Sequence, residues 1–323
     1  MTINESLAPK DGFALRLNQL DKTYPGRKGK PGKHALKSMT LDVPRGCIFG
    51  LLGPNGAGKS TLINILAGTV VKSSGTASIW GVDIDANPRQ SRANIGIVPQ
   101  ELNIDAFFTP RETLEMMAGM FGVPPEERRS DAILAEVGLT EQAHAYARTL
   151  SGGMRRRLLV GKAMVHQPPI LVLDEPTAGV DVNLRQKLWQ LIRSLNDQGV
   201  TIILTTHYLE EAEALCDRIA IINHGQLITE AATADLLAGA GHKTLVLTLA
   251  SALATLPQDV TEALTGLELD HDGDQLKITF STTVIATGEI LQKLGETSLT
   301  IKDISTEEPN LEDVFLTLTN DHG

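Results

Sequence analysis

Residues Gly53 to Thr61 read GPNGAGKST and match the phosphate-loop pattern G-x-x-x-x-G-K-[ST]. The glycines permit unusual backbone angles and let N–H groups approach an anion without a Cβ in the way. Lys59 can reach the β- and γ-phosphates of a triphosphate, and the Ser60 hydroxyl can bind Mg²⁺. The apolar run Cys47–Leu52 predicts a buried strand before the loop, and Thr61–Gly68 predicts a helix whose N-terminus faces the anion.

The bulk composition is that of an ordinary globular protein. The chain has 323 residues, enough for about two domains, with 42% hydrophobic and 21% charged residues. A net charge of −10 and the lack of a long basic run argue against a nucleic-acid partner. Two cysteines, Cys47 and Cys216, predict a reducing compartment and no disulfide framework. The sequence shows no secretory signal and no apolar run of the ~18 residues that span a bilayer, so another chain would have to supply any membrane span.

Two acidic residues follow a second buried strand. Ile170–Leu173 is a continuous apolar run, typical of a strand buried on both faces in a parallel sheet, and Asp174 and Glu175 end it. Ligands of α/β folds lie at this carboxyl edge. Asp174 is suited to binding Mg²⁺, and Glu175 is suited to orienting and deprotonating a water molecule.

Two further polar residues follow predicted strands of the same kind. Gln100 comes after Ile95–Val98, and His207 comes after Val200–Leu204. A lone Gln or His is more often structural than functional. Both become candidates for ligand contact because they lie at the ligand edge of a sheet that carries a phosphate loop.

Three weaker candidates have a structural alternative. Tyr24 starts the Gly-, Pro- and Lys-rich segment Lys22–His34, which predicts an exposed loop; the ring is either a surface aromatic or a face on which adenine stacks. Ser151, Gly152 and Gly153 either start a simple capped helix or form a second phosphate contact. Arg155–Arg157 follow, and we expect at least two of these three side chains to be solvated.

The rest of the chain predicts a helical block at about 107–167 and a second domain near the C-terminus. Asn183–Gln198 is an amphipathic helix that predicts core packing only. From about Gly239 onward the pattern predicts a small α+β domain, compatible with a ferredoxin-like fold, so the predicted domains are 1–238 and 239–323. Its predicted strands are Thr244–Leu249, Leu276–Phe280 and Leu299–Ile304, and its predicted helices are Thr283–Leu294 and Leu311–Leu318.

The order of these motifs resembles the ATP-binding cassette subunit of ABC transporters over about Phe13–Glu230. Tyr24 is similar to the adenine-stacking aromatic of that family, Leu150–Gly153 to its signature, and His207 to its switch histidine. Gln100 is similar to its glutamine loop, and Ala178–Asp181 to the loop that crosses the dimer interface. Met154 stands where many members carry Gln, and Val180 stands where Leu is common; neither change removes a phosphate-contacting group. The tail, residues 309–315, is similar to the ends of subunits paired with ABC-2-type exporter permeases of the drug-resistance, nodulation-factor and polysaccharide type.

The resemblance implies an α/β P-loop NTPase cassette: a mostly parallel core sheet, an antiparallel β subdomain and an α-helical subdomain, followed by the small α+β domain. It implies ATP hydrolysis with Mg²⁺ in a head-to-tail dimer of two copies. The implied catalytic residues are Lys59, Gln100, Glu175 and His207, and the implied metal ligands are Ser60, Gln100 and Asp174. The implied nucleotide contacts are Tyr24, Gly53, Pro54, Asn55, Gly56, Ala57, Gly58, Lys59, Ser60, Thr61, Gln100, Ser151, Gly152, Gly153, Asp174, Asp181 and His207.

The resemblance also implies a partner and a location. An ABC-2-type permease in trans would hold the subunit at the cytoplasmic face of the inner (plasma) membrane, with export as the expected direction. Three alternatives are an importer subunit, a soluble ABC-type ATPase, and a kinase with a phosphate loop. Soluble relatives usually carry two cassettes or long coiled coils, which this chain lacks, and a kinase has no use for a Ser-Gly-Gly signature. Only the tail argues against import.

Overall fold

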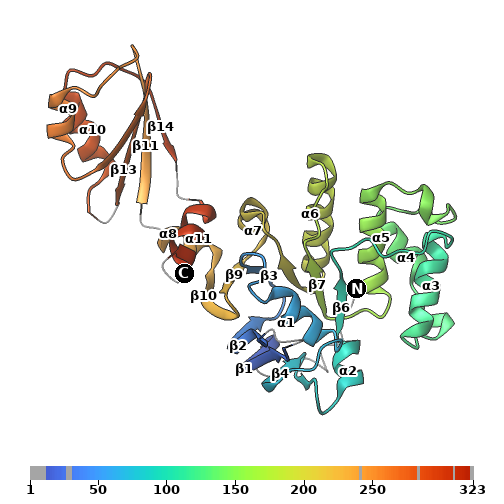
Figure 1. The fold of residues 1–323 in the computed structure, drawn as a ribbon. Helices are drawn as coiled ribbons and strands as arrows, with labels where there is room; N and C mark the ends of the chain where they lie inside the picture. The colour runs from blue at the N-terminus through green and yellow to red at the C-terminus, as the bar shows by residue number, and fades with distance from the viewer. Residues whose placement is uncertain (1–11, 27–30, 240–241, 282–283, 308–309, 321–323) are drawn as a thin grey trace. The chain divides into compact units, whose positions relative to one another are not determined.

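The computed structural model describes residues 12–26, 31–239, 242–281, 284–307 and 310–320 (Figure 1). The chain forms two compact units, Met1–Thr233 and Ala234–Gly323. The boundary lies a few residues before the predicted one at 238/239, because helix α8 (Thr233–Gly239) falls almost wholly in the second unit.

A mostly parallel sheet forms the centre of the first unit, in the order β10-β9-β3-β8-β7-β6. Neighbouring strands pair in parallel from β9 to β6, and only β10 is antiparallel. Every residue of β3 and β8 is buried, so both faces of these strands are covered. The strands are β3 (Ile48–Leu52), β6 (Ile95–Val98), β7 (Ile170–Asp174), β8 (Thr201–Thr205), β9 (Arg218–Asn223) and β10 (Gln226–Ala232). Helix α1 (Lys59–Leu66) follows β3, α6 (Val182–Asp197) connects β7 to β8, and α7 (Leu209–Leu215) connects β8 to β9.

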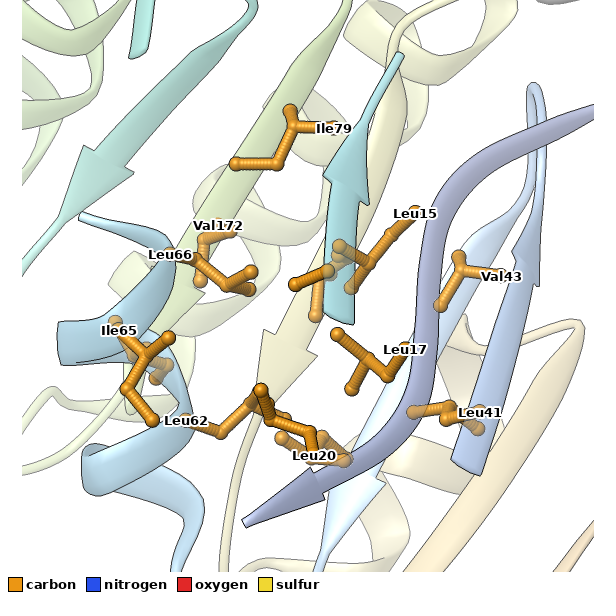
Figure 2. Close-up of a cluster of buried hydrophobic side chains, with 14 of the residues drawn as sticks. Leu15, Leu17, Leu20, Leu41, Val43, Leu62, Ile65, Leu66, Ile79 and Val172 are labelled. Atoms are coloured by element: carbon orange, nitrogen blue, oxygen red, sulfur yellow. The ribbon is translucent and has the colours of Figure 1, made fainter. Parts of the chain in front are cut away.

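An antiparallel sheet, in the order β2-β1-β4-β5, packs against α1 through leucines and other apolar side chains (Figure 2). Its strands are β1 (Phe13–Tyr24), β2 (Lys33–Pro44), β4 (Ser74–Ile79) and β5 (Val82–Asp83), and α2 (Pro88–Ala93) follows. The prediction of a loop over Lys22–His34 is wrong at both ends. Tyr24 pairs with Lys33 and Thr23 with His34, so the β1–β2 ladder continues into both ends of this Gly-, Pro- and Lys-rich segment. Residues 27–30 of that segment lie outside the described residues.

A helical subdomain occupies most of the predicted block at 107–167. Helices α3, α4 and α5 lie together in Figure 1 and contact one another pairwise. Buried Leu114, Ile133 and Leu158 supply one apolar side chain from each helix. A capping box formed by Thr109 and Glu112 starts α3. The bounds are α3 (Pro110–Met120), η2 (Pro125–Glu127), α4 (Ser130–Glu136), η3 (Ala147–Thr149) and α5 (Gly152–Met164).

The second unit contains an antiparallel sheet in the order β12-β13-β11-β14. From β11 to β14 its elements follow the order β-α-β-β-α-β, which the ferredoxin-like fold uses. Helices α9 and α10 share an apolar core with one face of the sheet. The bounds are β11 (His242–Leu249), α9 (Gln258–Ala263), β12 (Glu268–Asp272), β13 (Gln275–Ser281), α10 (Thr287–Gly295), β14 (Ile301–Glu307) and α11 (Leu311–Asn320). The predicted helix start at Thr283 lies outside the described residues. Across the described parts of both units, no helix combines the length and the apolar character that a membrane crossing requires.

Candidate nucleotide-binding site

A cavity of about 670 Å³ opens at the phosphate loop, Gly53–Thr61. All nine residues of the loop line it. The other lining residues are Lys33, Ala35, Gln100, Asp174, Glu175 and His207. The folded chain therefore brings four separate predicted residues, Gln100, Asp174, Glu175 and His207, to the loop that precedes α1. They meet there because β6, β7 and β8 run parallel and end at the same sheet edge.

Glycine is required at two positions of the phosphate loop by close backbone contacts. A Cβ on Gly53 would lie 2.2 Å from the carbonyl oxygen of Ile222, and one on Gly58 would lie 2.7 Å from that of Ala35. Gly58 also has a φ of 116°, in the region that side chains disfavour. The backbone of the loop thus packs closely against β9 and β2, two strands that are not adjacent to it in sequence.

The side chain of Lys59 is 7% exposed and lies under the loop. Its Nζ donates hydrogen bonds to the carbonyl oxygens of Gly53 at 2.6 Å and Pro54 at 3.2 Å. Burial lowers the pKa of this ammonium, and the nearby carboxylates of Glu175 and Asp174 act in the opposite direction. The ammonium therefore sits where a phosphate group could replace the loop carbonyls as its partner.

Thr205, at the end of β8, holds the acidic end of β7. Its hydroxyl donates to the Asp174 carboxylate at 2.5 Å and accepts from the backbone N–H of Glu175 at 3.1 Å. Glu175 has a φ of 46°, uncommon for a residue with a side chain. Such backbone strain clusters at functional sites, where the surroundings enforce it.

The Glu175 carboxylate is the point at which three predicted residues meet. Gln100 donates to one carboxylate oxygen at 2.7 Å, and Nδ1 of His207 lies 3.3 Å from the other. The side chain of Glu175 is 13% exposed, whereas that of His207 is 47% exposed. A water molecule held between Glu175 and a terminal phosphate would thus have a carboxylate as its acceptor and two polar neighbours.

The donor set in the cavity fits Mg²⁺. Ser60, Gln100 and Asp174 offer a hydroxyl, an amide oxygen and a carboxylate, and Mg²⁺ takes oxygen ligands that include substrate phosphates. The described residues contain no group of three or more His, Cys, Asp and Glu side chains that could hold a metal by themselves. A site completed by nucleotide phosphates is consistent with both observations.

Five predicted nucleotide contacts lie outside this cavity. Ser151 and Asp181 cap helices: each side chain accepts from a backbone N–H three residues on, at 3.3 Å and 2.9 Å. The prediction that Ser151 is an N-cap is therefore confirmed. Ser151 and Gly152 are exposed, and Gly153 is buried against Leu184.

Tyr24 is the fifth of these residues. Lys22 Nζ lies 4.8 Å from the centre of its ring. In the β1–β2 ladder its partner is Lys33, which does line the cavity. Tyr24 therefore lies on the strand next to one that lines the cavity, but does not itself line it.

Arg156 is buried, whereas Arg155 and Arg157 are half-buried, so the expectation that at least two of these three side chains are solvated is met only in part. All three guanidinium groups donate to backbone carbonyl oxygens: Arg155 to Ala147 and Arg148, Arg156 to Pro99, Gln100 and Glu175, and Arg157 to Val137 and Gly138. Loops and helix ends around α5 leave carbonyls that need donors, and arginine supplies several. A signal existed for Arg156: Gly153 and Val160, at helical spacing on either side of it, are apolar.

Lys33, Ala35 and Thr205 are site residues that sequence reasoning missed. Lys33 and Ala35 reach the cavity through the pairing of β2 with β1, which no local pattern reveals. Thr205 directly follows the predicted strand Val200–Leu204, and a Thr at the ligand edge of a sheet is a usable signal.

Comparisons with known proteins agree with this geometry. The model of the ABC transporter family matches residues 36–178 of this chain. The linearmycin resistance ATP-binding protein LnrL of Bacillus subtilis is 36% identical over 318 residues, which cover 94% of this chain and 98% of that protein. The chain belongs to the ABC transporter family. The Nod factor export ATP-binding protein I of Rhizobium etli is 35% identical to this ABC subunit over 313 residues, 95% of this chain and 93% of that protein.

A solved structure shows the same cassette fold. It is a dimeric ATP-binding cassette in a post-hydrolysis state bound to ADP and phosphate, with a TM-score of 0.60 and 28% identity over 68% of this chain and 98% of that one. The predicted fold class, a P-loop NTPase cassette with an added C-terminal domain, is confirmed. The ABC subunit binds ATP and is an ATPase.

Proposed function

We propose that this ABC subunit powers the export of a substrate through a separate ABC-2-type permease, using ATP hydrolysed between two copies of itself. The observation that carries the proposal is the convergence of Lys59, Gln100, Asp174, Glu175 and His207 on one cavity. Export is supported by two full-length relatives, one named for linearmycin resistance and one for Nod factor export. The permease would keep the subunit at the cytoplasmic face of the plasma membrane.

Each cavity residue has a role that its contacts support. Lys59 exchanges the carbonyls of Gly53 and Pro54 for the β- and γ-phosphates, and the N–H groups of the loop and of α1 hold the same anion. Glu175 orients the attacking water and accepts its proton. Gln100 and His207, already within reach of Glu175, contact the γ-phosphate and stabilise charge in the transition state. Ser60, Asp174 and Gln100 would hold Mg²⁺, which neutralises phosphate charge when bound.

A second copy explains the predicted contacts that lie outside the cavity. Ser151 and Gly152 are exposed at the N-terminus of α5, where backbone N–H groups attract an anion, but they do not line their own chain's cavity. In a head-to-tail dimer the signature of one copy would contact the γ-phosphate held by the other, and Asp181 would lie at the crossing. ATP then stabilises the dimer, and hydrolysis removes that stabilisation.

A second cavity, of about 480 Å³, supports docking of the permease. It lies between β6 and the helical subdomain and is lined mostly by apolar side chains. Its charged lining residues are Arg92 and Lys162, and neither forms an ion pair with another described residue. An amphipathic helix from a cytoplasmic loop of the permease, with carboxylates facing these two cations, fits this groove. Pro99, one residue before Gln100, also lines it, which connects the groove to the nucleotide site.

The direct test of the catalytic assignment is Glu175→Gln. The amide keeps the shape of the side chain but cannot accept the proton of the attacking water, so kcat for phosphate release should fall by ~10²-fold or more. ATP affinity of the isolated subunit should persist, because Glu175 contacts the water. Glu101→Gln, in the exposed loop nearby, is the matched control and should hydrolyse ATP normally. A wild-type rate for Glu175→Gln would refute the assignment.

A further inference from the structure

Arg156 is a buried charge at the junction of three segments of the site. Its side chain comes from α5 and is 5% exposed. Nη1 donates to the carbonyl oxygens of Pro99 at 3.0 Å and Gln100 at 2.8 Å, and Nη2 lies 3.5 Å from that of Glu175. One guanidinium thus joins α5, which we call the signature helix because it begins at the signature Leu150–Gly153, to the loop after β6 and the loop after β7.

Both loops carry residues of the hydrolytic site. The amide of Gln100 donates to the Glu175 carboxylate at 2.7 Å, so the two loops are linked a second time through side chains. Arg156 contacts the same two residues through their backbone oxygens. The main chain of Glu175 is therefore fixed between Thr205 on one side and Arg156 on the other, which helps to maintain its positive φ.

We infer that Arg156 is a positioning residue for ATP hydrolysis, which holds Gln100 and Glu175 in register with the signature helix. The inference rests on the proposed roles of Gln100 and Glu175. Because α5 begins at the Ser151 cap, any movement of Gln100 toward a γ-phosphate would be passed through Arg156 to the helix that presents Ser151 to the second copy. The loop that carries Gln100 and the helix that carries Ser151 would then move together.

The chemistry of the contact requires a guanidinium. Three carbonyl oxygens on two loops need several donors in a fixed plane, which arginine provides and the single ammonium of lysine does not. Asp174 and Glu175 attract the positive charge, and this attraction opposes the lowering of the Arg156 pKa by burial. A neutral side chain would lose both the charge attraction and part of the hydrogen bonding.

Kinetics of Arg156→Gln and Arg156→Lys test the inference. Displacing Glu175 by a fraction of an ångström should lower kcat by ~10- to 100-fold, with the glutamine variant slower than the lysine variant. The affinity of the isolated subunit for ATP should stay within about twofold, since Arg156 does not line the cavity. Adding Arg156→Gln to Glu175→Gln should lower the residual rate by less than about twofold, because Arg156 acts through Glu175.

Arg157→Lys is the matched control. This neighbouring guanidinium donates to the carbonyl oxygens of Val137 at 2.7 Å and Gly138 at 2.9 Å, away from the cavity, so its replacement should lower the thermal midpoint without lowering kcat. The inference is overturned if the Arg156 variants keep kcat, or if they lose kcat, ATP affinity and thermal midpoint together. A normal rate in Arg156→Gln beside a slow Glu175→Gln would refute the inference alone. A normal rate in Glu175→Gln would refute the proposed function as well.

Discussion

At the scale of single residues, His166 couples the stability of the first unit to pH. Its ring stacks on Phe121 with 3.7 Å between centroids, and Nε2 lies 3.2 Å from the carbonyl oxygen of Ile95. Among the described residues Nδ1 is buried without a hydrogen-bond partner. Burial lowers the pKa of the imidazole from 6.5 to about 4. Near neutral pH the ring is therefore uncharged, and Nε2–H donates to Ile95.

The folded pKa lies below the unfolded one, so between these two pH values the unfolded chain binds a proton that the folded chain does not. The free energy of unfolding should consequently fall as the pH drops from about 6.5 to about 4, by up to ~3 kcal/mol. Replacing His166 by Gln keeps a donor for Ile95 and removes the titration, so the variant should lose less stability over this range. Urea denaturation followed by tryptophan fluorescence measures this, since Trp80 and Trp189, the chain's two tryptophans, both lie in the first unit.

The exposed His144 supplies the control for this pH experiment, and His144→Gln should keep the wild-type slope of stability against pH. Parallel slopes for wild type and His166→Gln would contradict the account of His166.

The sequence predicts those site residues that can be recognised from their neighbours in the chain. The phosphate loop and the Asp174–Glu175 pair are short motifs beside apolar runs, and the cavity contains all of them. The burial of Arg156 was not predicted and Lys33 was missed, because their partners are distant in sequence. Arg156 meets carbonyls more than fifty residues away, and Lys33 reaches the cavity through a strand pairing. No window of neighbouring residues contains that information.

At the scale of elements, the groove between β6 and the helical subdomain should bind the permease through its two cations. Arg92 on α2 and Lys162 on α5 stand at the groove, and an acidic partner helix would pair with both. Reversing both charges, Arg92→Glu with Lys162→Glu, should lower co-purification of a co-expressed ABC-2-type permease by ~10-fold or more, because like charges then face each other. ATP binding by the isolated subunit should be unchanged.

Helix α2 provides a control within the same element. Arg89 is exposed on α2 but does not line the groove, so Arg89→Glu combined with Lys37→Glu matches the change in net charge and should leave co-purification intact. Equal losses for both double variants would show that overall charge, and not the groove, governs the association.

The longest helix was predicted, whereas several short elements were missed. The amphipathic stripe predicted a helix over Asn183–Gln198 that packs on the core, and α6 spans Val182–Asp197 with Leu188, Leu191, Ile192 and Leu195 buried. Helices α2 and α9 and strands β5 and β12 were not predicted. Each has six residues or fewer, too few to repeat a helical or alternating pattern. Tertiary pairing decides the structure of such segments.

At the scale of the whole molecule, the account depends on two copies completing each other's sites. One chain places the phosphate loop, Gln100, Glu175 and His207 in a single cavity, yet leaves Ser151 and Gly152 exposed outside it. The order of motifs was sufficient to predict the cassette fold and this division of the site. The position of the domain boundary was less predictable, because α8 has only seven residues.

The molar mass of Glu175→Gln at saturating ATP and Mg²⁺, measured by light scattering after gel filtration, tests this claim most directly. The slow variant should accumulate as a species of twice the 34.7 kDa of one chain. It should return to one chain when ATP is replaced by ADP, or when Ser151→Arg blocks the signature. Two results together would contradict the account. The ATP-loaded Glu175→Gln variant would stay at the 34.7 kDa of one chain, and the wild type would hydrolyse ATP as a monomer without any loss of rate.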